Sequence, residues 1–245
     1  MAVLKWGEDG KRTYETGVSK GVIYPISGGR YRDAHVWDGL TAVNENPSGG
    51  EPTKLYADNG VWIVMVSAEE YDFTVEGYKK PKGADECFGK PQIAEGVRIG
   101  QQNSKPFGFT YQTTVGNDRE GNDHSYRIHL IFKSYAAPVS ENHSTVSNEA
   151  DPETFSWDAS SIPVLLDDGH KAAKMVIDAQ ELKAAGLTNV LQSIEDLVYG
   201  TDNTDPTFPT TTKLFELFEI GKYLLDSSGD KLLDSNGNPI ESAVY

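Results

Sequence analysis

Cysteine is almost absent from this chain, because Cys87 is the only one among 245 residues. A single cysteine excludes an internal disulfide framework and any zinc site built from several cysteines. Since an isolated cysteine usually behaves as a small apolar side chain, we expect Cys87 to be buried in a core. At 38% hydrophobic residues, the chain has enough apolar side chains to form such a core.

Long hydrophobic runs are missing too. The longest, Val61–Val66, is about a third of the length that spans a bilayer. The N-terminus lacks the basic stretch and following apolar stretch of a secretory signal. We therefore expect no membrane partner and a protein that folds in a cytoplasm.

Positive charge is scarce. The chain has 22 Lys and Arg against 37 Asp and Glu, a net charge of −15, and no arginine follows Arg127. This acidity excludes a protein that recognises nucleic-acid sequence, because phosphate contacts need clustered Lys and Arg. Two interpretations of the acidity stay open: a solvated surface that keeps the protein soluble, or a surface that must repel another polyanion.

Patterns that carry chemistry are also absent. The sequence contains no Gly-rich phosphate loop, its five histidines have no metal-ligand helical spacing, and its paired acids are adjacent, so that on strands they point to opposite faces. We expect no catalytic, cofactor-binding or metal-binding residues. Two carboxylates from distant segments could still meet in the fold, as a hydrolase would require.

Strand patterns dominate the sequence. Apolar residues alternate with polar ones in Tyr71–Val75, Phe107–Val115 and Tyr126–Lys133, and the polar stretch Gly116–Asp123 predicts that the last two strands form a hairpin with a long tip. Further strands are expected at Gly17–Tyr24, Gly39–Val43, Val61–Ser67, Phe155–Ala159 and Lys174–Asp178.

One helix is clearly indicated. An apolar stripe runs from Leu187 to Val198 with helical spacing, Thr188 is the expected N-cap, and Gly200 lies just past the end. Gly186 should separate this helix from a shorter turn over residues 178–185. The predicted class is therefore mainly β (α+β), a sheet-rich body with a flanking α-helix, and not an alternating βαβ fold.

The stretch Asn44–Pro52 predicts a long loop. It holds two Pro and two Gly, which we expect to keep it out of a regular ladder. Long loops without secondary structure in compact domains are usually functional or disordered.

The C-terminal tail differs from the rest. Thr201–Pro206 is expected to be a linker, and Leu224–Lys231 is echoed by Leu232–Pro239, a repeat that suggests a short hairpin. We therefore divide the chain into residues 1–200 and an extension of residues 201–245.

Several segments, in order over about residues 1–200, resemble the major tail protein, or tail tube protein, of long-tailed phages of Gram-positive bacteria. The block Trp37–Asn59 is the most specific of them. The other segments are Gly21–Pro25, Ser67–Tyr71 through Glu86–Cys87, Gly100–Gln102, Phe107–Phe109, Gly116–Asp118 and Leu197–Gly200.

This resemblance implies a β-sandwich flanked by a helix, with six copies per ring and rings stacked into a tube. The inner sheets of a ring would join into one β-barrel around a channel through which viral DNA passes without specific binding. The family has no catalytic residues and no cofactor. Its partners are further copies of itself and other tail proteins, namely the tape measure, terminator and distal tail proteins. The expected location is the virion tail tube, and the host cytoplasm during assembly.

The expected subunit contact is the loop between Asn44 and Asn59. Its Pro and Gly should prevent local pairing, yet it carries apolar side chains, so we expect it to contact an adjacent subunit, in the next ring, and to order on assembly. The site residues are Asn44, Pro47, Gly49, Gly50, Leu55, Tyr56, Asp58 and Asn59.

The channel wall should come from strands with one polar face. The candidates are Val61–Glu70, Phe107–Val115 and Tyr126–Lys133. Arg127 and Lys133 share a face of the last strand, so we expect them to pair with acids or to lie at a subunit junction, leaving the lumen negative. Besides the hydrolase, one rival class stays open: a β-sandwich adhesin or baseplate protein that binds cell-surface carbohydrate through clustered Trp and Tyr.

Overall fold

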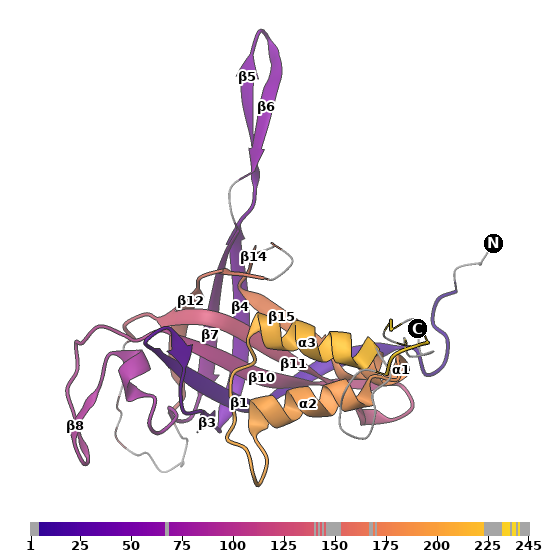
Figure 1. Ribbon diagram of the computed structural model, residues 1–245. Helices are drawn as coiled ribbons and strands as arrows, with labels where there is room; N and C mark the ends of the chain where they lie inside the picture. The colour runs from indigo at the N-terminus through magenta and orange to yellow at the C-terminus, as the bar shows by residue number, and fades with distance from the viewer. Residues whose placement is uncertain are drawn as a thin grey trace.

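The structure is a computed structural model. It describes residues 5–66, 69–139, 141, 143, 145, 153–166, 169, 171–222, 232–235, 237–238 and 240. This part of the chain is mainly β, and every strand pair in it is antiparallel (Figure 1). The mainly β class expected from the sequence is thereby confirmed.

Nine strands form the main sheet, in the order β2-β1-β10-β11-β12-β7-β4, with β3 paired to β1 and β15 paired to β11. Their bounds are β1 (Thr13–Ser27), β2 (Arg30–Tyr31), β3 (His35–Trp37), β4 (Leu40–Gly49), β7 (Glu69–Gly77), β10 (Phe107–Asn117), β11 (Gly121–Ala136), β12 (Phe155–Ser161) and β15 (Lys174–Asp178).

The sheet folds over at β11. The middle of this strand pairs with β15, whereas its last residues, Ser134–Ala136, pair with β12. We call β1, β10, β11 and β15 the first half-sheet, and β12, β7 and β4 the second. Phe109 and Ile131 of the first half-sheet share one buried cluster with Phe73 and Trp157 of the second. The two half-sheets therefore face each other across a common core.

Helices cover the other face of the first half-sheet (Figure 1). They are α1 (Ala179–Ala184), α2 (Thr188–Tyr199) and α3 (Thr211–Lys222). Val190, Leu191, Ile194 and Val198 of α2 are buried, in one cluster with Ile128 of β11. The predicted helix and its apolar stripe are thus confirmed.

The expected N-cap was wrong. Leu187 occupies the cap position of α2, makes no side-chain cap hydrogen bond, and leaves Thr188 as the first helical residue. The side-chain cap in this region belongs to α1, where the Asp178 carboxylate accepts hydrogen bonds from the amides of Gln180 and Glu181. Gly186, at φ +73°, separates the two helices as expected.

Each predicted strand coincides with an observed one, although Ser67 lies outside the described residues, and β15 has the predicted bounds. The hairpin of β10 and β11 is confirmed, but its long polar tip is not. Asn117 pairs with Gly121, so only the intervening residues 118–120 form the turn. Polar residues extended the ladder here because the hydrogen bonds of a strand use backbone groups.

The C-terminal part packs onto the body. The expected linker after Gly200 is a turn closed by a Thr201–Thr204 bridge. Phe208 and Leu214 are then buried in the same cluster as α2, and α3 had not been predicted. The first copy of the period-eight repeat lies outside the described residues. At the second copy, the amide of Ile240, one residue past its end, donates to the Leu232 carbonyl and closes a turn.

Smaller elements complete the fold. They are the hairpins β5–β6 (Pro52–Ala57, Gly60–Val66), β8–β9 (Gln92–Ala94, Val97–Arg98) and β13–β14 (Val164–Leu165, Lys171–Ala172) and the turn η1 (Asp85–Phe88). Cys87 in η1 is fully buried, as expected, and burial raises the pKa of its thiol to about 12. None of the helices in the described residues is long and apolar enough to cross a membrane.

Candidate functional site

The predicted loop over residues 44–52 is wrong. β4 continues to Gly49 and stays paired with β7 as far as Glu69, with Pro47 opposite Tyr71. The physical reason is the place of β4 in the sheet. It ends the strand order, so one of its edges makes no ladder among the described residues, and an edge strand tolerates a proline that lacks an N–H.

Beyond β4 the chain forms a second, separate ladder. β5 and β6 pair from Pro52–Val66 to Ala57–Gly60, and the turn residues Asp58 and Asn59 both have positive φ, 49° and 61°. Two such residues are typical of a tight type I′ hairpin turn. Figure 1 shows this hairpin, which we call the arm (residues 52–66), projecting far from the body.

The structure therefore gathers the eight predicted site residues along one continuous feature. Asn44, Pro47 and Gly49 lie in β4, Gly50 connects β4 to the arm, and the last four lie in the arm, namely Leu55, Tyr56, Asp58 and Asn59. The expectation that this segment does not pair locally is wrong. The turn formers between two extended runs were the signal that could have revealed the hairpin.

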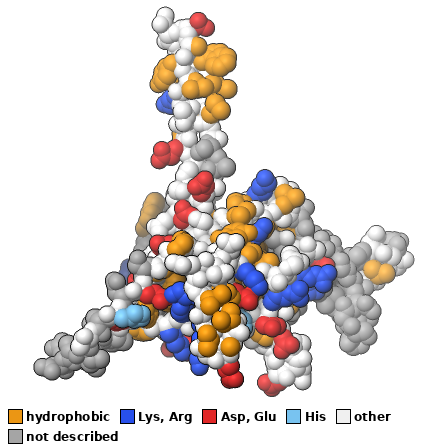
Figure 2. Space-filling view, turned by 90° about the vertical axis from the view of Figure 1, so that its left-hand side faces the viewer, with side chains coloured by type: hydrophobic (Ala, Val, Ile, Leu, Met, Phe, Trp, Pro, Cys, Tyr) orange, Lys and Arg blue, Asp and Glu red, His pale blue; other side chains and the backbone are white. Residues whose placement is uncertain are grey.

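The arm exposes apolar side chains on both faces. Leu55, Ile63 and Met65 share one face by their register, and Val64 and Val66 alternate onto the other; all five are exposed. Tyr56 and Trp62 are 71% and 70% exposed. Figure 2 shows these apolar side chains along the arm, with acidic ones below them toward the body. A strand that is apolar on both sides is normally buried on both faces, and exposed patches of this kind usually mark interaction sites.

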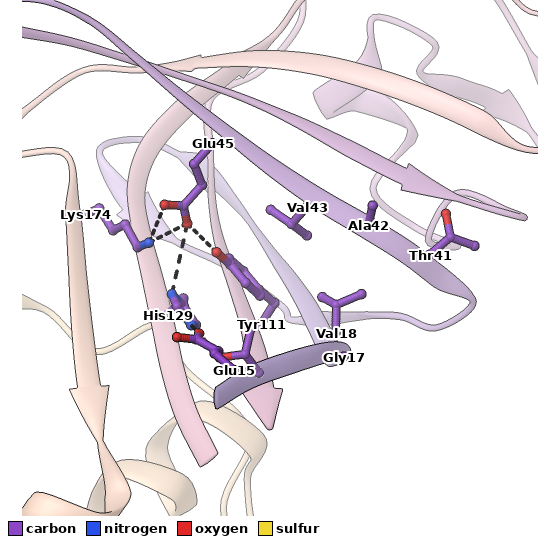
Figure 3. Close-up of a pocket in the computed structure, with 11 residues that line it drawn as sticks. Glu15, Gly17, Val18, Thr41, Ala42, Val43, Glu45, Tyr111, His129 and Lys174 are labelled. Carbon is purple, nitrogen blue, oxygen red and sulfur yellow. Dashed lines mark hydrogen bonds and ion pairs between the residues drawn. The ribbon is translucent and has the colours of Figure 1, made fainter. Parts of the chain in front are cut away.

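A cavity of about 520 Å³ opens between the half-sheets (Figure 3). β1 and β4 flank it, and Tyr111 of β10, His129 of β11 and Lys174 of β15 also line it. Its apolar wall includes Val18 and Val43. The charged side chains, with Tyr111 and His129, lie together at one end, where Glu45 of β4 meets the first half-sheet, and Thr41 lies at the other end.

Glu45 is the centre of this polar cluster. Lys174 Nζ lies 2.5 Å from Glu45 Oε2 and also contacts Oε1, to which the Tyr111 hydroxyl donates. Burial alone would raise the pKa of Glu45, but the hydrogen bonds from Lys174 and Tyr111 hold it below its ordinary value. Burial and the Glu45 carboxylate raise the pKa of Tyr111. The carboxylate is therefore ionised and fixed by its partners.

His129 is held in its neutral form. Its ring stacks on Tyr111 with centroids 4.4 Å apart, and its Nε2 lies 2.8 Å from Thr113 Oγ1. Its Nδ1 has no hydrogen-bond partner, and burial, with the charge of Lys174, lowers its pKa to about 4. Because the imidazole is neutral, no second cation is buried beside that of Lys174.

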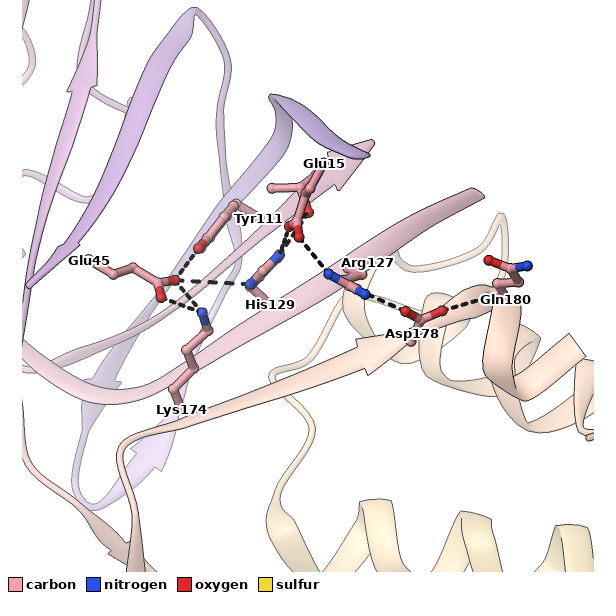
Figure 4. A network of polar contacts seen from close by, with 9 residues as sticks. Glu15, Glu45, Tyr111, Arg127, His129, Lys174, Asp178 and Gln180 are labelled. Carbon is pink, nitrogen blue, oxygen red and sulfur yellow. Dashed lines mark hydrogen bonds and ion pairs between the residues drawn. The ribbon is translucent and has the colours of Figure 1, made fainter. Parts of the chain in front are cut away.

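Arg127 pairs with acids, as expected. Its Nη1 lies 2.6 Å from Glu15 Oε2 and its Nε lies 2.8 Å from Asp178 Oδ2, as Figure 4 shows. Asp178 also caps α1, so this chain of contacts links β1, β11 and the first helix. The guanidinium of Arg127 is therefore already paired with two acids of the same chain.

The cluster is a poor candidate for acid–base chemistry. Glu15 and Glu45 both line the cavity, but each is engaged by a cation, and both have lowered pKa values despite their burial. A glycosidase needs one carboxyl with a raised pKa to act as the acid. Among the described residues, no group of three or more His, Cys, Asp and Glu could hold a metal ion.

Two of the predicted channel strands are covered. Thr110 and Gln112 of β10 are buried on the helix side, where the Tyr199 hydroxyl lies 3.4 Å from Gln112 Oε1. On β11, Ile128 is buried against the helices and His129 faces the other half-sheet. The third candidate, from residue 61, belongs to the arm. The pattern of a polar face in the sequence does not reveal the helix that covers it.

A different face of the protein is acidic. β4, β7 and β12 contain no Lys or Arg. Their apolar residues point into the core, so the alternate residues form one outward face, with Asp72, Glu76 and Asp158 among them. Thr74 donates to Asp158 over 2.6 Å, and Asn44 donates to Glu76 over 3.0 Å. We call this the acidic face. It lies on the far side of the core from the helices.

Comparison with known proteins adds no relative: neither a protein-family model nor a curated protein matches the chain.

Proposed function

We propose that this protein is a structural tail tube protein of a long-tailed phage, which assembles with itself into hexameric rings that stack into a tube. The facing half-sheets fit the β-sandwich of that family, and the α-helices of the described residues lie on one outer face. The observation that carries the proposal is the arm, whose two apolar faces have no cover within the described chain.

The arm is suited to joining copies of an acidic protein. Lys54 and Asp58 are the only charged residues between Pro52 and Val66, so the arm is close to neutral in a chain of net charge −15. Copies can therefore meet through the arm without bringing like charges together. Covering its apolar surface would contribute about 25 cal/mol for each Å² removed from water.

The acidic face is the proposed channel wall. It replaces the predicted strands of the hairpin β10–β11, which the helices and the facing half-sheet cover. A wall with carboxylates and no basic residue repels DNA phosphates, so DNA passes without being bound. The helices then lie on the outside of the tube. A hollow of about 590 Å³ on this face, lined by Asn46, Asp72 and Asp158, leaves room for water.

This role implies further partners. The two ends of the tube would contact other tail proteins, namely the distal tail, terminator and tape measure proteins. The location would be the virion, with assembly in the host cytoplasm. The carbohydrate-binding alternative predicts aromatic rings on a concave face, whereas Tyr56 and Trp62 stand on a projecting hairpin (Figure 2).

Negative-stain microscopy of the purified protein tests the proposal. The wild type should form tubes. In the test variant, residues 52–66 are replaced by an Asn-Gly turn, which closes β4 onto β7 because Pro52 and Val66 are paired. It should remain a folded monomer and form no tubes. The matched control is Gln192→Ala, at an exposed position on α2. Normal tubes from the armless variant would refute the role of the arm.

A further inference from the structure

The arm leaves the body at a well-defined root. Glu45 is the last partly buried residue of β4, since positions 46–49 are all exposed. On the returning strand, Glu69 and Glu70 are exposed and Tyr71 is the first buried residue. Tyr71 pairs with Pro47, two positions beyond Glu45. The two residues therefore mark the point where the hairpin passes from packed to unpacked.

The two strands at this root are anchored differently. β7 pairs with β4 on one edge and with β12 on the other, up to Tyr71. β4 pairs with β7 alone among the described strands. Its connection to the first half-sheet therefore depends on its inward side chains. Leu40 and Val43 pack against the core, and Glu45, nearest the arm, is the charged one.

We propose that Glu45, held by Lys174 and Tyr111, is a clasp that sets the direction in which the arm leaves the body. In this role Glu45 is a positioning residue for assembly, and the inference rests on the proposed function. The clasp joins β4 to β10 and β15 across the cavity, as Figure 4 shows. It acts on β4, which pairs with β7 alone among the described strands.

Directional contacts are needed at this point. A two-stranded ribbon is marginally stable alone and twists more than a wider sheet, so its path is weakly fixed by its own hydrogen bonds. Apolar contacts such as those of Val43 are non-directional. Lys174 engages both oxygens of Glu45. Buried ion pairs of this kind serve specificity of geometry in several systems, more than net stability.

Distances between spin labels test the clasp directly. Labels are placed at the arm tip (Asp58→Cys) and on α1 (Ala184→Cys) in a Cys87→Ala background, with labelled chain diluted into unlabelled chain so that only distances within one copy are read. The parent should give a single narrow distance distribution. Glu45→Gln and Lys174→Met should each broaden it and shift its mean.

Two controls separate direction from stability. Asn46→Ala changes the neighbouring residue of β4, which points to the acidic face, and should leave the distribution narrow. Val198→Ala removes buried volume in the helix-side cluster, away from the clasp, and should lower the melting temperature without broadening the distribution. If Glu45→Gln does not fold, Lys174→Met and Tyr111→Phe give the same test.

The outcomes are distinct from those of the proposed function. Broadened distances in the clasp variants, with narrow ones in both controls, support the clasp even if the protein forms no tubes. A distribution as narrow as the parent's in every folded clasp variant overturns it, even if wild-type tubes form. Where tubes do form, the clasp variants should assemble fewer or irregular ones, whereas Asn46→Ala should assemble normally.

Discussion

The ring of Phe208 lies directly over Gly108, close enough that a β-carbon at position 108 would come within 2.7 Å of it. This contact fixes the segment after α2 onto β10. Gly108→Ala should therefore destabilise the fold by about 1–3 kcal/mol, because overpacking forces neighbours to move. Urea unfolding measures the loss. The control is Gly100→Ala, where a β-carbon would meet nothing within 4 Å. Equal stability of the two variants would show that this contact is not tight.

Regular local patterns made much of the fold predictable. The alternation from Tyr71 to Val75 indicates a half-buried strand because one face of β7 packs on the core. The apolar stripe of α2 indicates a helix for the same reason, because one face of that helix packs on the core. The segment over residues 44–52 was mispredicted because local propensity favours a loop, whereas the ladder to β7 is a tertiary contact that overrides it.

Only the location of the candidate site along the chain could be predicted from the sequence, and not its contacts. The sequence indicated the segment of the arm, because apolar residues there have no nearby partner. It could not indicate the clasp, since Glu45 and Lys174 are 129 residues apart and no periodicity joins them. The polar side chains of Thr110 and Gln112 suggested a solvent-facing surface, but both are buried, because helices from far along the chain cover them.

The two tyrosines near Glu45 should respond differently to loss of their hydroxyls. Tyr111 donates to the ionised carboxylate, so Tyr111→Phe should cost about 1.5–3 kcal/mol. The Tyr71 hydroxyl lies near the same carboxylate, and burial together with that charge raises its pKa, but it makes no hydrogen bond of normal geometry, so Tyr71→Phe should cost less than Tyr111→Phe. Chemical denaturation of both variants checks this. A larger loss for Tyr71→Phe than for Tyr111→Phe would contradict the assignment of partners.

Stability should fall on mild acidification because of His129. Its pKa is about 4 in the folded protein against 6.5 as its ordinary value. The unfolded chain therefore takes up the proton first. The contribution of His129 is complete above pH 6.5 and declines by up to about 3 kcal/mol as the pH falls toward 4. Below that window, protonation of Glu15 and Glu45, whose pKa values are lowered, adds further loss.

The measurement is the free energy of unfolding from pH 7 to pH 4.5. His129→Gln should show a flatter dependence than the wild type over this range. The matched control is His35→Gln, at a partly buried position outside the cluster, which should keep the wild-type slope. An unchanged slope for His129→Gln would mean that another group carries the acid sensitivity.

Charge reversal on the acidic face should impair transport more than assembly. Asp158→Lys places a cation on the proposed wall, where it would attract phosphate and slow the passage of DNA. The effect should grow at low salt, because screening weakens the attraction. Rates of DNA release from particles carrying Asp158→Lys give the result, with Gln192→Lys on the helix side as control. Equal slowing by both variants would count against this face as the wall.

The most direct test of the account is a cryo-electron microscopy structure of the assembled wild-type protein. The account predicts stacked sixfold rings, an inner wall formed by the face that carries Asp72 and Asp158, and arms covered on both faces by other copies. A protein that stays monomeric, or a tube whose channel is lined by the helix side of the first half-sheet, would contradict it.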